Sequence, residues 1–112
     1  MNTVFLHGFV SSNPSISIME SGRKIAFVFL TTEFKCHGGQ GTPETILVQH
    51  QLVAYDHLAE RLYEIASEGK ELFVEGQLYS YQRYGNNGDD CPSANVVIEK
   101  LHLSGLKVYV QD

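Results

Sequence analysis

The residues best suited to chemistry lie in the stretch Phe73–Asp90, FVEGQLYSYQRYGNNGDD. Its first part alternates like a strand, so Tyr79, Tyr81 and Arg83 share one face. Two flat aromatic rings and a guanidinium in one row offer a surface on which planar groups can stack, beside a positive charge for an anion. The stretch ends in Gly85–Asp90, whose Gly, Asn and Asp residues suit the tight turn of a hairpin. We therefore predict a long hairpin arm with an aromatic and cationic face.

Aromatic and cationic side chains also stand beside turns elsewhere in the chain. Those that extend the candidate surface are Phe34, Lys35, Tyr55 and Tyr84, with Arg23 and Lys24 at an earlier turn. The aromatic members would stack on planar groups, and the cations would hold phosphate groups. The competing interpretations are ordinary strand packing for the aromatics and simple hydration for the cations.

Signals for other chemistry are weak. No Ser–His–acid or Cys–His pairing is visible from the spacing, so we expect no catalytic residue and no enzyme. The loop Glu33–Pro43 is rich in glycine, but its spacing and the lack of a following helix argue against a dinucleotide site. Cys36 and His37 have no second pair at ligand spacing, so we expect neither a metal nor another cofactor, and we expect Cys36 and Cys91 to be free thiols. His50 lies among apolar residues, which favours an interior or interface histidine with a satisfied ring.

The composition predicts one folded domain with an acidic balance. The 112 residues are 43% hydrophobic and 19% charged, which is typical of a globular protein and suits a single domain over residues 1–112. The net charge of −5 opposes binding of a polyanion through bulk charge, so such a partner would need stacking and a local cluster of cations. No apolar run is long enough to span a membrane and no signal peptide is visible, so we expect no membrane partner and a cytoplasmic location.

Alternating apolar patterns predict five strands and one helix. The strands are expected at Val4–Val10, Lys24–Thr32, Thr45–Tyr55, Leu72–Tyr84 and Asn95–Leu103. The first is expected to continue at Ile16–Ile18 after a turn, and an extra edge strand is expected at 106–110. The helix is expected over Asp56–Glu68, with Asp56 as its N-cap and Gly69 as its stop. One helix between the third and fourth of five strands is the order of the OB-fold, an all-β Greek-key barrel, here with long hairpin arms.

One predicted strand is apolar on both faces. Within Lys24–Thr32, the residues Ile25, Phe27 and Phe29 lie on one face, and Ala26, Val28 and Leu30 lie on the other. The interior of a small barrel takes only one face of a strand, so the second face must meet another surface. Together with the strand Val4–Val10, this excess of apolar surface predicts self-association as a homodimer or homotetramer.

Several short segments, spread over Asn2 to Leu103, match a known pattern in order and spacing. They are Met1-Asn2-Thr3-Val4-Phe5-Leu6-His7-Gly8, Asn13-Pro14, Ser21-Gly22, Ala26–Thr32, His50 with the strand after it, Leu58-Ala59-Glu60, and Gly69–Leu78. They resemble the bacterial-type single-stranded DNA-binding proteins. That resemblance implies an OB-fold that self-associates, usually as a tetramer, and wraps single-stranded DNA with little sequence preference in replication, recombination and repair. In a bacterium such a protein is expected at the nucleoid.

The resemblance also assigns roles to single residues. Phe34 matches a stacking aromatic at the base of the first arm, Tyr55 an aromatic just before the helix, and Arg83 or Tyr84 an aromatic position on the long arm. The partner that it implies is single-stranded DNA. RNA stays an open alternative, because stacking does not distinguish ribose from deoxyribose.

Departures from the family pattern favour a second interpretation. Gln49 stands where the family commonly has a tryptophan, and Tyr79 and Tyr81 stand where it tends towards cations. The chain ends at Val110-Gln111-Asp112, so we expect no acidic tail for recruiting other proteins. The alternative function is an OB-fold protein-interaction module, a primosome-like accessory protein, with weak or no nucleic-acid binding.

Overall fold

The computed structural model describes residues 1–39, 41–84 and 90–103, with the backbone alone for 81–84, 90–94 and 103. Its elements in chain order are β1 Val4–Val10, β2 Ser15–Ile18, β3 Lys24–His37, β4 Pro43–Tyr55, α1 Asp56–Ile65, β5 Glu71–Tyr84 and β6 Asp90–Leu103. The five expected strands and the helix are present, and the strand expected to continue at Ile16–Ile18 is the short β2. The predicted edge strand at 106–110 lies outside the described residues.

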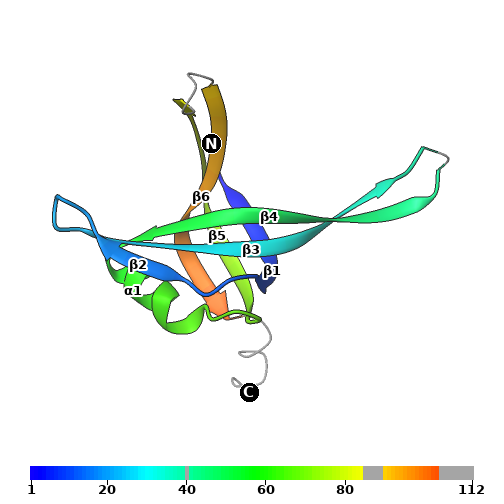
Figure 1. Cartoon of the computed structure of the whole chain (residues 1–112). Helices are drawn as coiled ribbons and strands as arrows, with labels where there is room; N and C mark the ends of the chain where they lie inside the picture. Colours follow the sequence, from blue (N-terminus) through cyan, green and yellow to red (C-terminus); the bar gives the residue numbers. More distant parts are fainter. Residues whose placement is uncertain (40, 85–89, 104–112) are drawn as a thin grey trace, which may run out of the picture.

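The strands close into a five-stranded barrel, which confirms the predicted OB-fold. Hydrogen-bonded neighbours follow the order β1-β5-β6-β4-β3, and β1 also pairs with β3, which joins the two edges of the sheet. β2 pairs with β3 beyond the point where β1 leaves it, so β1 and β2 act as one bent strand. β4 and β6 run parallel, whereas the other described pairings are antiparallel. Figure 1 shows the barrel at the centre, α1 against one end and hairpins projecting outwards.

The core consists of the inward-facing, alternate residues of the strands. On β3 and β4 this row is Ala26, Val28, Leu30, Leu52 and Ala54, all of which are buried. α1 closes one end of the barrel with the buried residues Ala59 and Leu62, followed by Ala66 just beyond the helix. Burial of a Val or Leu side chain contributes roughly 1.5–3 kcal/mol to the free energy of folding. A shift in strand register would expose these residues, so the core fixes the register of the strands from which the arms extend.

Two glycines permit close approach of strands at the points where the barrel bends. A Cβ atom on Gly8 of β1 would lie 2.1 Å from the carbonyl oxygen of Thr31 on β3. A Cβ atom on Gly76 of β5 would lie 2.2 Å from the carbonyl oxygen of Val97 on β6, next to a shift in pairing register between Glu75 and Gly76. Because neither glycine has a side chain, the neighbouring backbones can approach closely and the sheet can close into a barrel.

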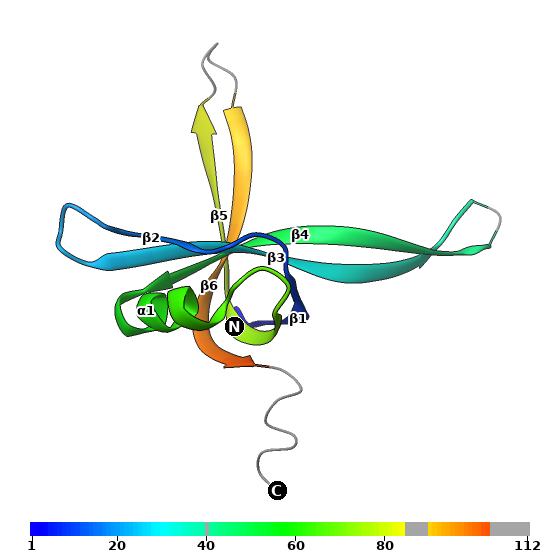
Figure 2. The same cartoon turned by 60° about the horizontal axis from the view of Figure 1, so that its bottom comes forward.

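The hairpin of β3 and β4 is longer than the sequence predicts. The stretch Glu33–Pro43 is expected to be a loop, but β3 continues to His37 and pairs with β4 as far as Pro43. Figures 1 and 2 show this hairpin as an arm that extends well beyond the barrel. Both faces of such an arm meet water, so polar residues are compatible with strand pairing there, and the loop prediction from polarity was wrong for Glu33–His37.

The helix also begins and ends differently from the prediction. Its N-cap is Tyr55, which makes no side-chain capping hydrogen bond, and Asp56 is the first helical residue, with φ of 56°. The Asp56 carboxylate accepts hydrogen bonds from Arg23 instead, so the N-cap prediction was wrong. The helix ends at Ile65, and Gly69, with φ of 92°, lies in the connection to β5.

We expect Gly8→Ala to lower the free energy of unfolding by about 1–3 kcal/mol, because the new methyl group must push β1 away from β3. Urea unfolding followed by circular dichroism measures the change. Gly39→Ala is a matched control, since nothing lies within 4 Å of a Cβ atom at that position. Equal unfolding midpoints for Gly8→Ala and the unaltered protein would contradict the role given to this contact.

Candidate nucleic-acid interface

Two hairpin arms carry the predicted aromatic residues away from the barrel. The β3–β4 arm bears Phe34 and Lys35, and the β5–β6 arm bears Tyr79 near its base. Figures 1 and 2 show the two arms diverging from the central barrel. Phe34 and Tyr79 are each 55% exposed, so both rings are accessible to a partner. The predicted aromatics therefore lie on separate arms and not in one compact patch.

Tyr79 lies at one end of a row of residues that crosses the sheet. The paired residues are Tyr79 on β5, Asn95 on β6, Gln51 on β4 and Phe29 on β3. Directly paired residues share a face of the sheet, and this row lies on the face opposite the core row of β3. The sequence placed Phe29 on an apolar second face but gave no sign of Gln51 or Asn95 beside it, because the pairing joins residues far apart in the chain.

Asn2 positions the base of the β5–β6 arm. Its side-chain Nδ2 donates to the Leu78 carbonyl at 2.8 Å, and its Oδ1 accepts from the Leu78 N–H at 3.0 Å. The asparagine side chain thus extends the pairing of β1 with β5, which in the backbone begins at Val4 and Gly76. Tyr79 follows Leu78 directly, so this double hydrogen bond fixes where the aromatic part of the arm starts. A lone asparagine ahead of the first strand carries no sequence pattern that would reveal this role.

Arg23 and Tyr55 come together at the start of α1. The guanidinium carbon of Arg23 lies 4.8 Å from the centroid of the Tyr55 ring, which is cation–π geometry. Arg23 also donates from Nη2 at 2.9 Å and from Nε at 3.1 Å to Oδ2 of Asp56. The hydrogen bond from Arg23 is the main cause that holds the pKa of the Asp56 carboxyl below its ordinary value. The predicted cation Arg23 therefore contacts the predicted aromatic Tyr55, and the Asp56 carboxylate balances the positive charge of Arg23.

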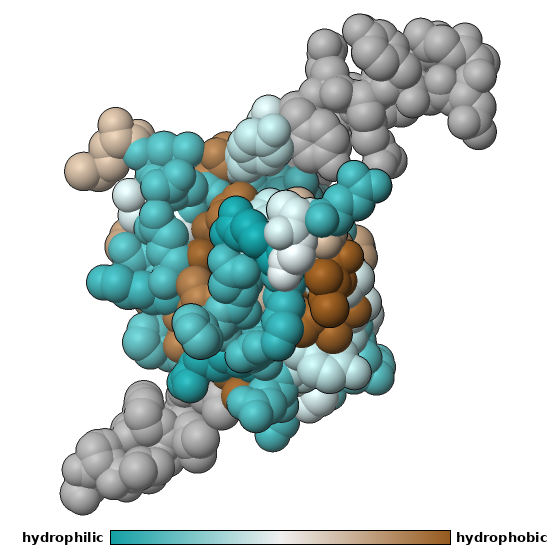
Figure 3. All heavy atoms as spheres, turned by 90° about the vertical axis from the view of Figure 1, so that its left-hand side faces the viewer, coloured by the Kyte–Doolittle hydropathy of each residue, from teal (hydrophilic) through white to brown (hydrophobic). Residues whose placement is uncertain are grey.

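The two predicted lysines are also paired with carboxylates. Lys24 Nζ donates to Glu60 Oε2, and this hydrogen bond is the main cause that lowers the pKa of Glu60. Lys35 Nζ lies 3.4 Å from Glu33 Oε1 on the β3–β4 arm. These pairs are solvent-exposed and therefore weak, so a phosphate can compete for the same cations. The end of the molecule that carries the β2–β3 turn is mostly hydrophilic, with smaller hydrophobic patches (Figure 3).

His50 is a satisfied, half-buried residue, as the sequence predicts. Its Nε2 lies 2.9 Å from Oγ1 of Thr32 on the neighbouring strand. Burial lowers the pKa of the His50 imidazole, which favours the neutral ring. Across the described ranges, no group of three or more His, Cys, Asp or Glu residues could hold a metal ion. None of the helices in those ranges has the length and apolar character needed to cross a membrane.

Part of the predicted surface lies beyond the described side chains. The backbone of β5 extends to Tyr84, and it pairs with β6 up to Asp90. The side chains of Tyr81, Arg83 and Tyr84 lie outside the described residues. Among the predicted site residues with described side chains, Arg23 and Tyr55 make a direct cation–π contact with each other.

The sequence matches the pattern of the single-strand binding protein family over residues 1–104. A single-stranded DNA-binding protein of Xanthomonas campestris pv. campestris is 26% identical over 106 residues, which are 94% of this chain and 61% of that protein. A single-stranded DNA-binding protein of Xanthomonas axonopodis pv. citri is also 26% identical over 106 residues, which are 94% of this chain and 58% of that protein. The chain thus spans about three fifths of the length of these relatives.

Solved structures show the same fold. The Plasmodium falciparum SSB in its complex with ssDNA superposes with a TM-score of 0.80 at 21% identity, over 91% of this chain and 93% of that chain. A variant of the single-stranded DNA binding protein from Thermus aquaticus superposes with a TM-score of 0.79 at 23% identity, over 96% of this chain and 52% of that chain. At these identities the likeness establishes the architecture of the barrel and its arms.

Proposed function

The chain belongs to the single-strand binding protein family, and on that premise we propose that it binds single-stranded DNA with little sequence preference. The observation that carries the proposal is the exposure of Phe34 and Tyr79 on two arms that leave one barrel. A nucleic-acid strand presents flat rings in series, so it can stack on both arms at once. Every base has a π-face, and for that reason such stacking is tolerant of sequence.

Aromatic side chains on the arms and at the helix start provide the stacking contacts. We assign this role to Phe34, Tyr55, Tyr79, Tyr81 and Tyr84. Each stacked base is expected to contribute about 1–3 kcal/mol. Tyr55 has the Arg23 guanidinium against its ring, so a base stacked near it would lie close to a cation as well.

Cations next to these aromatics provide the phosphate contacts. We assign this role to Arg23, Lys24, Lys35 and Arg83. The first three each have a carboxylate partner, and a phosphate must displace it before the contact forms. Each contact must first break an existing ion pair, so the net gain in binding energy per phosphate contact is small. Stacking therefore supplies the larger part of the affinity in a chain with a net charge of −5.

Binding of this kind suits a protein of DNA replication, recombination and repair, working at the nucleoid if the source is bacterial. Residues 1–112 would act as one binding domain, without an enzymatic step. The same stacking surface would accept RNA, because stacking does not read the sugar.

A protein-interaction module is the second candidate function. The observation that favours it is the pairing of Arg23 with Asp56 and of Lys24 with Glu60. An OB-fold whose turn cations are neutralised in this way offers a partner protein both charges and hydrogen-bonding groups, whereas it offers DNA a weaker positive field.

We also propose that copies of the chain associate as a homodimer or homotetramer through the outer face of β1 and β5. Phe5 and Phe73 lie on that face, 61% and 40% exposed, with ring centroids 6.4 Å apart. His7 and His102 flank Phe73 at centroid distances of 6.3 and 6.5 Å. A cluster of exposed rings on one sheet face is the kind of patch that forms interfaces between proteins.

Single-strand binding is tested by titrating the protein with oligo-dT while following tyrosine fluorescence, with a gel-shift assay at low salt. We expect quenching, and we expect Tyr79→Leu to weaken binding by about 5- to 150-fold, the equivalent of one lost stacked base. Tyr63→Leu is the matched control, because Tyr63 is an exposed tyrosine on α1, away from both arms. Neither quenching nor a shifted band for the unaltered protein would favour the protein-interaction module.

Asp56→Asn should release Arg23 for a phosphate. Asparagine tolerates the positive φ at this position, so the helix start is retained while the charge is removed. We expect tighter binding of oligo-dT and a slope of log K against log salt that is steeper by about 0.7, the value for one added phosphate contact on a single strand. Glu64→Gln removes the same charge elsewhere on α1 and serves as the control. Equal slopes for both variants would show that Arg23 does not reach the DNA.

The double variant Phe5→Ser/Phe73→Ser should dissociate the assembly, because it removes the rings at the centre of the proposed interface. Light scattering at micromolar concentration should give the mass of a dimer or tetramer for the unaltered protein and that of a monomer for the variant. Tyr63→Ser removes an exposed ring from α1 and should leave the mass unchanged. An unaltered protein that is monomeric, or a double variant of unchanged mass, would contradict this interface.

A further inference from the structure

The β5–β6 arm leaves the barrel at the point where one neighbour of β5 ends. The backbone pairing of β1 with β5 begins at Val4 and Gly76, whereas β5 continues to Tyr84. Beyond Gly76, β6 is the remaining strand partner of β5 in the described part of the chain. A two-stranded hairpin is only marginally stable in water and twists more strongly than a larger sheet. The direction of this arm therefore depends on what holds its base.

Asn2 supplies the missing contact through its side chain. Val4 pairs with Gly76, so counting two residues outwards from this pair places Asn2 opposite Leu78. In a hydrogen-bonded antiparallel pair, two facing residues exchange both of their N–H···O bonds. The Asn2 amide reproduces this exchange, because Nδ2 donates to the Leu78 carbonyl at 2.8 Å and Oδ1 accepts from the Leu78 N–H at 3.0 Å. One side chain thus takes the place of a third strand at the base of the arm.

The contact requires an amide at this position. The Leu78 backbone presents one donor and one acceptor, and a carboxamide offers both complementary groups in one plane. An aspartate carboxylate only accepts, so it would leave the Leu78 carbonyl without a donor. Neither Asn2 nor Leu78 is among the residues that we assign to DNA contacts. Any effect of Asn2 on DNA binding therefore acts through the arm.

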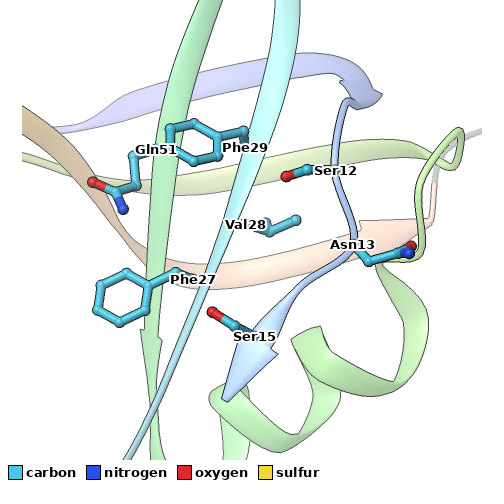
Figure 4. Close-up of a pocket in the computed structure, with 7 residues that line it drawn as sticks. All are labelled: Ser12, Asn13, Ser15, Phe27, Val28, Phe29 and Gln51. Atoms are coloured by element: carbon cyan, nitrogen blue, oxygen red, sulfur yellow. The ribbon is translucent and has the colours of Figure 1, made fainter. Parts of the chain in front are cut away.

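The residue after Leu78 is where the direction of the arm matters. Tyr79 is 55% exposed and pairs with Asn95, from which the row continues through Gln51 to Phe29. Figure 4 shows the side chains of Gln51 and Phe29 on neighbouring strands at the far end of this row. The double hydrogen bond lies one residue before Tyr79, so it sets the angle between the aromatic part of the arm and the rest of the sheet. An arm that swings at Leu78 brings Tyr79 into line with the sheet for only part of the time.

We propose that Asn2 is a positioning residue for single-strand binding, an inference that rests on the proposed function. Its amide holds the β5–β6 arm in the direction that presents Tyr79 to a strand, without contacting DNA itself. Without this contact the arm samples several directions, and the apparent dissociation constant rises in inverse proportion to the competent fraction. No cation takes part, so the salt dependence of binding is independent of Asn2.

The test compares the oligo-dT affinity of Asn2→Ala and Asn2→Asp with that of the unaltered protein. We expect each variant to bind about 3- to 10-fold more weakly, as for an arm that is competent roughly a tenth to a third of the time. The slope of log K against log salt should not change for Asn2→Ala. Thr3→Ala is the matched control, since Thr3 is the exposed next residue and lies outside the contact with Leu78.

A double-mutant cycle separates positioning from a general loss of stability. Asn2→Ala should weaken binding less in a Tyr79→Leu background than in the unaltered protein, because one of the groups that the arm positions is then absent. Equal fold-changes in the two backgrounds would overturn the proposal. A lower mass of Asn2→Ala by light scattering would also overturn it, because the effect would then belong to assembly.

Amide hydrogen exchange followed by NMR tests the contact in the absence of DNA. Asn2→Ala should speed exchange of the Leu78 N–H by about 2- to 13-fold, the equivalent of one lost hydrogen bond, and should leave exchange of the buried Val74 unchanged. Faster exchange at Leu78 with an unaltered affinity for oligo-dT makes Asn2 a purely structural contact and overturns its role in binding. If the unaltered protein does not bind oligo-dT, the proposed function itself fails, whatever the exchange at Leu78 shows.

Discussion

Closure of the barrel at the junction of β1 with β3 is the constraint on which the other features depend. β1 must pair with β5 along most of its length and still reach β3 at Phe9 and Val10. That contact requires backbone against backbone at Gly8, where even a methyl group would overlap the Thr31 carbonyl. Once the barrel is closed, the parts of β3, β4, β5 and β6 that exceed its height have no third strand to pair with. They become two-stranded arms, and on the β3–β4 arm most side chains of both faces are exposed. The exposure of Phe34 is thus a geometric consequence of closing a barrel with strands longer than it needs.

The charge distribution decides how such arms can bind. The chain has eight lysine and arginine residues against thirteen acidic ones, and Arg23, Lys24 and Lys35 each have an acidic partner nearby. A polyanion therefore meets cations whose field is largely cancelled until their partners are displaced. Acidic partners do not weaken aromatic stacking in this way, because stacking requires neither a net positive field nor the release of counterions. The sequence of the β5–β6 arm includes Tyr79 and Tyr81, which suit the stacking proposed for this surface.

Local patterns in the sequence were enough to predict the fold, because strand alternation, one amphipathic helix and its position in the order define the OB-fold. They were also enough to predict a satisfied His50, since an imidazole in an apolar run needs a partner on the next strand. They failed where the outcome depends on pairs far apart in the chain. Asp56 is of a residue type that favours the N-cap position, but its carboxylate accepts hydrogen bonds from Arg23, which lies 33 residues earlier in the chain. Glu33–His37 has the composition of a loop, but its pairing with β4 makes it a strand. The row from Phe29 to Tyr79 spans four strands, and no window of the sequence contains it.

The two outer faces that carry exposed phenylalanines differ in the residues around those rings. Around Phe73 the neighbours are rings: Phe5, His7 and His102 all lie within 6.5 Å, centroid to centroid. Two of these three rings are imidazoles, and His7 Nε2 lies 2.7 Å from Glu71 Oε2, so this face combines aromatic rings with a polar pair. Around Phe27 and Phe29 the neighbours are serine hydroxyls and the Gln51 amide. Covering those groups with an apolar surface would leave donors and acceptors without partners, which is unfavourable. The sequence showed an apolar second face on this strand, and the fold places serine hydroxyls and the Gln51 amide beside it, which the sequence pattern alone does not reveal.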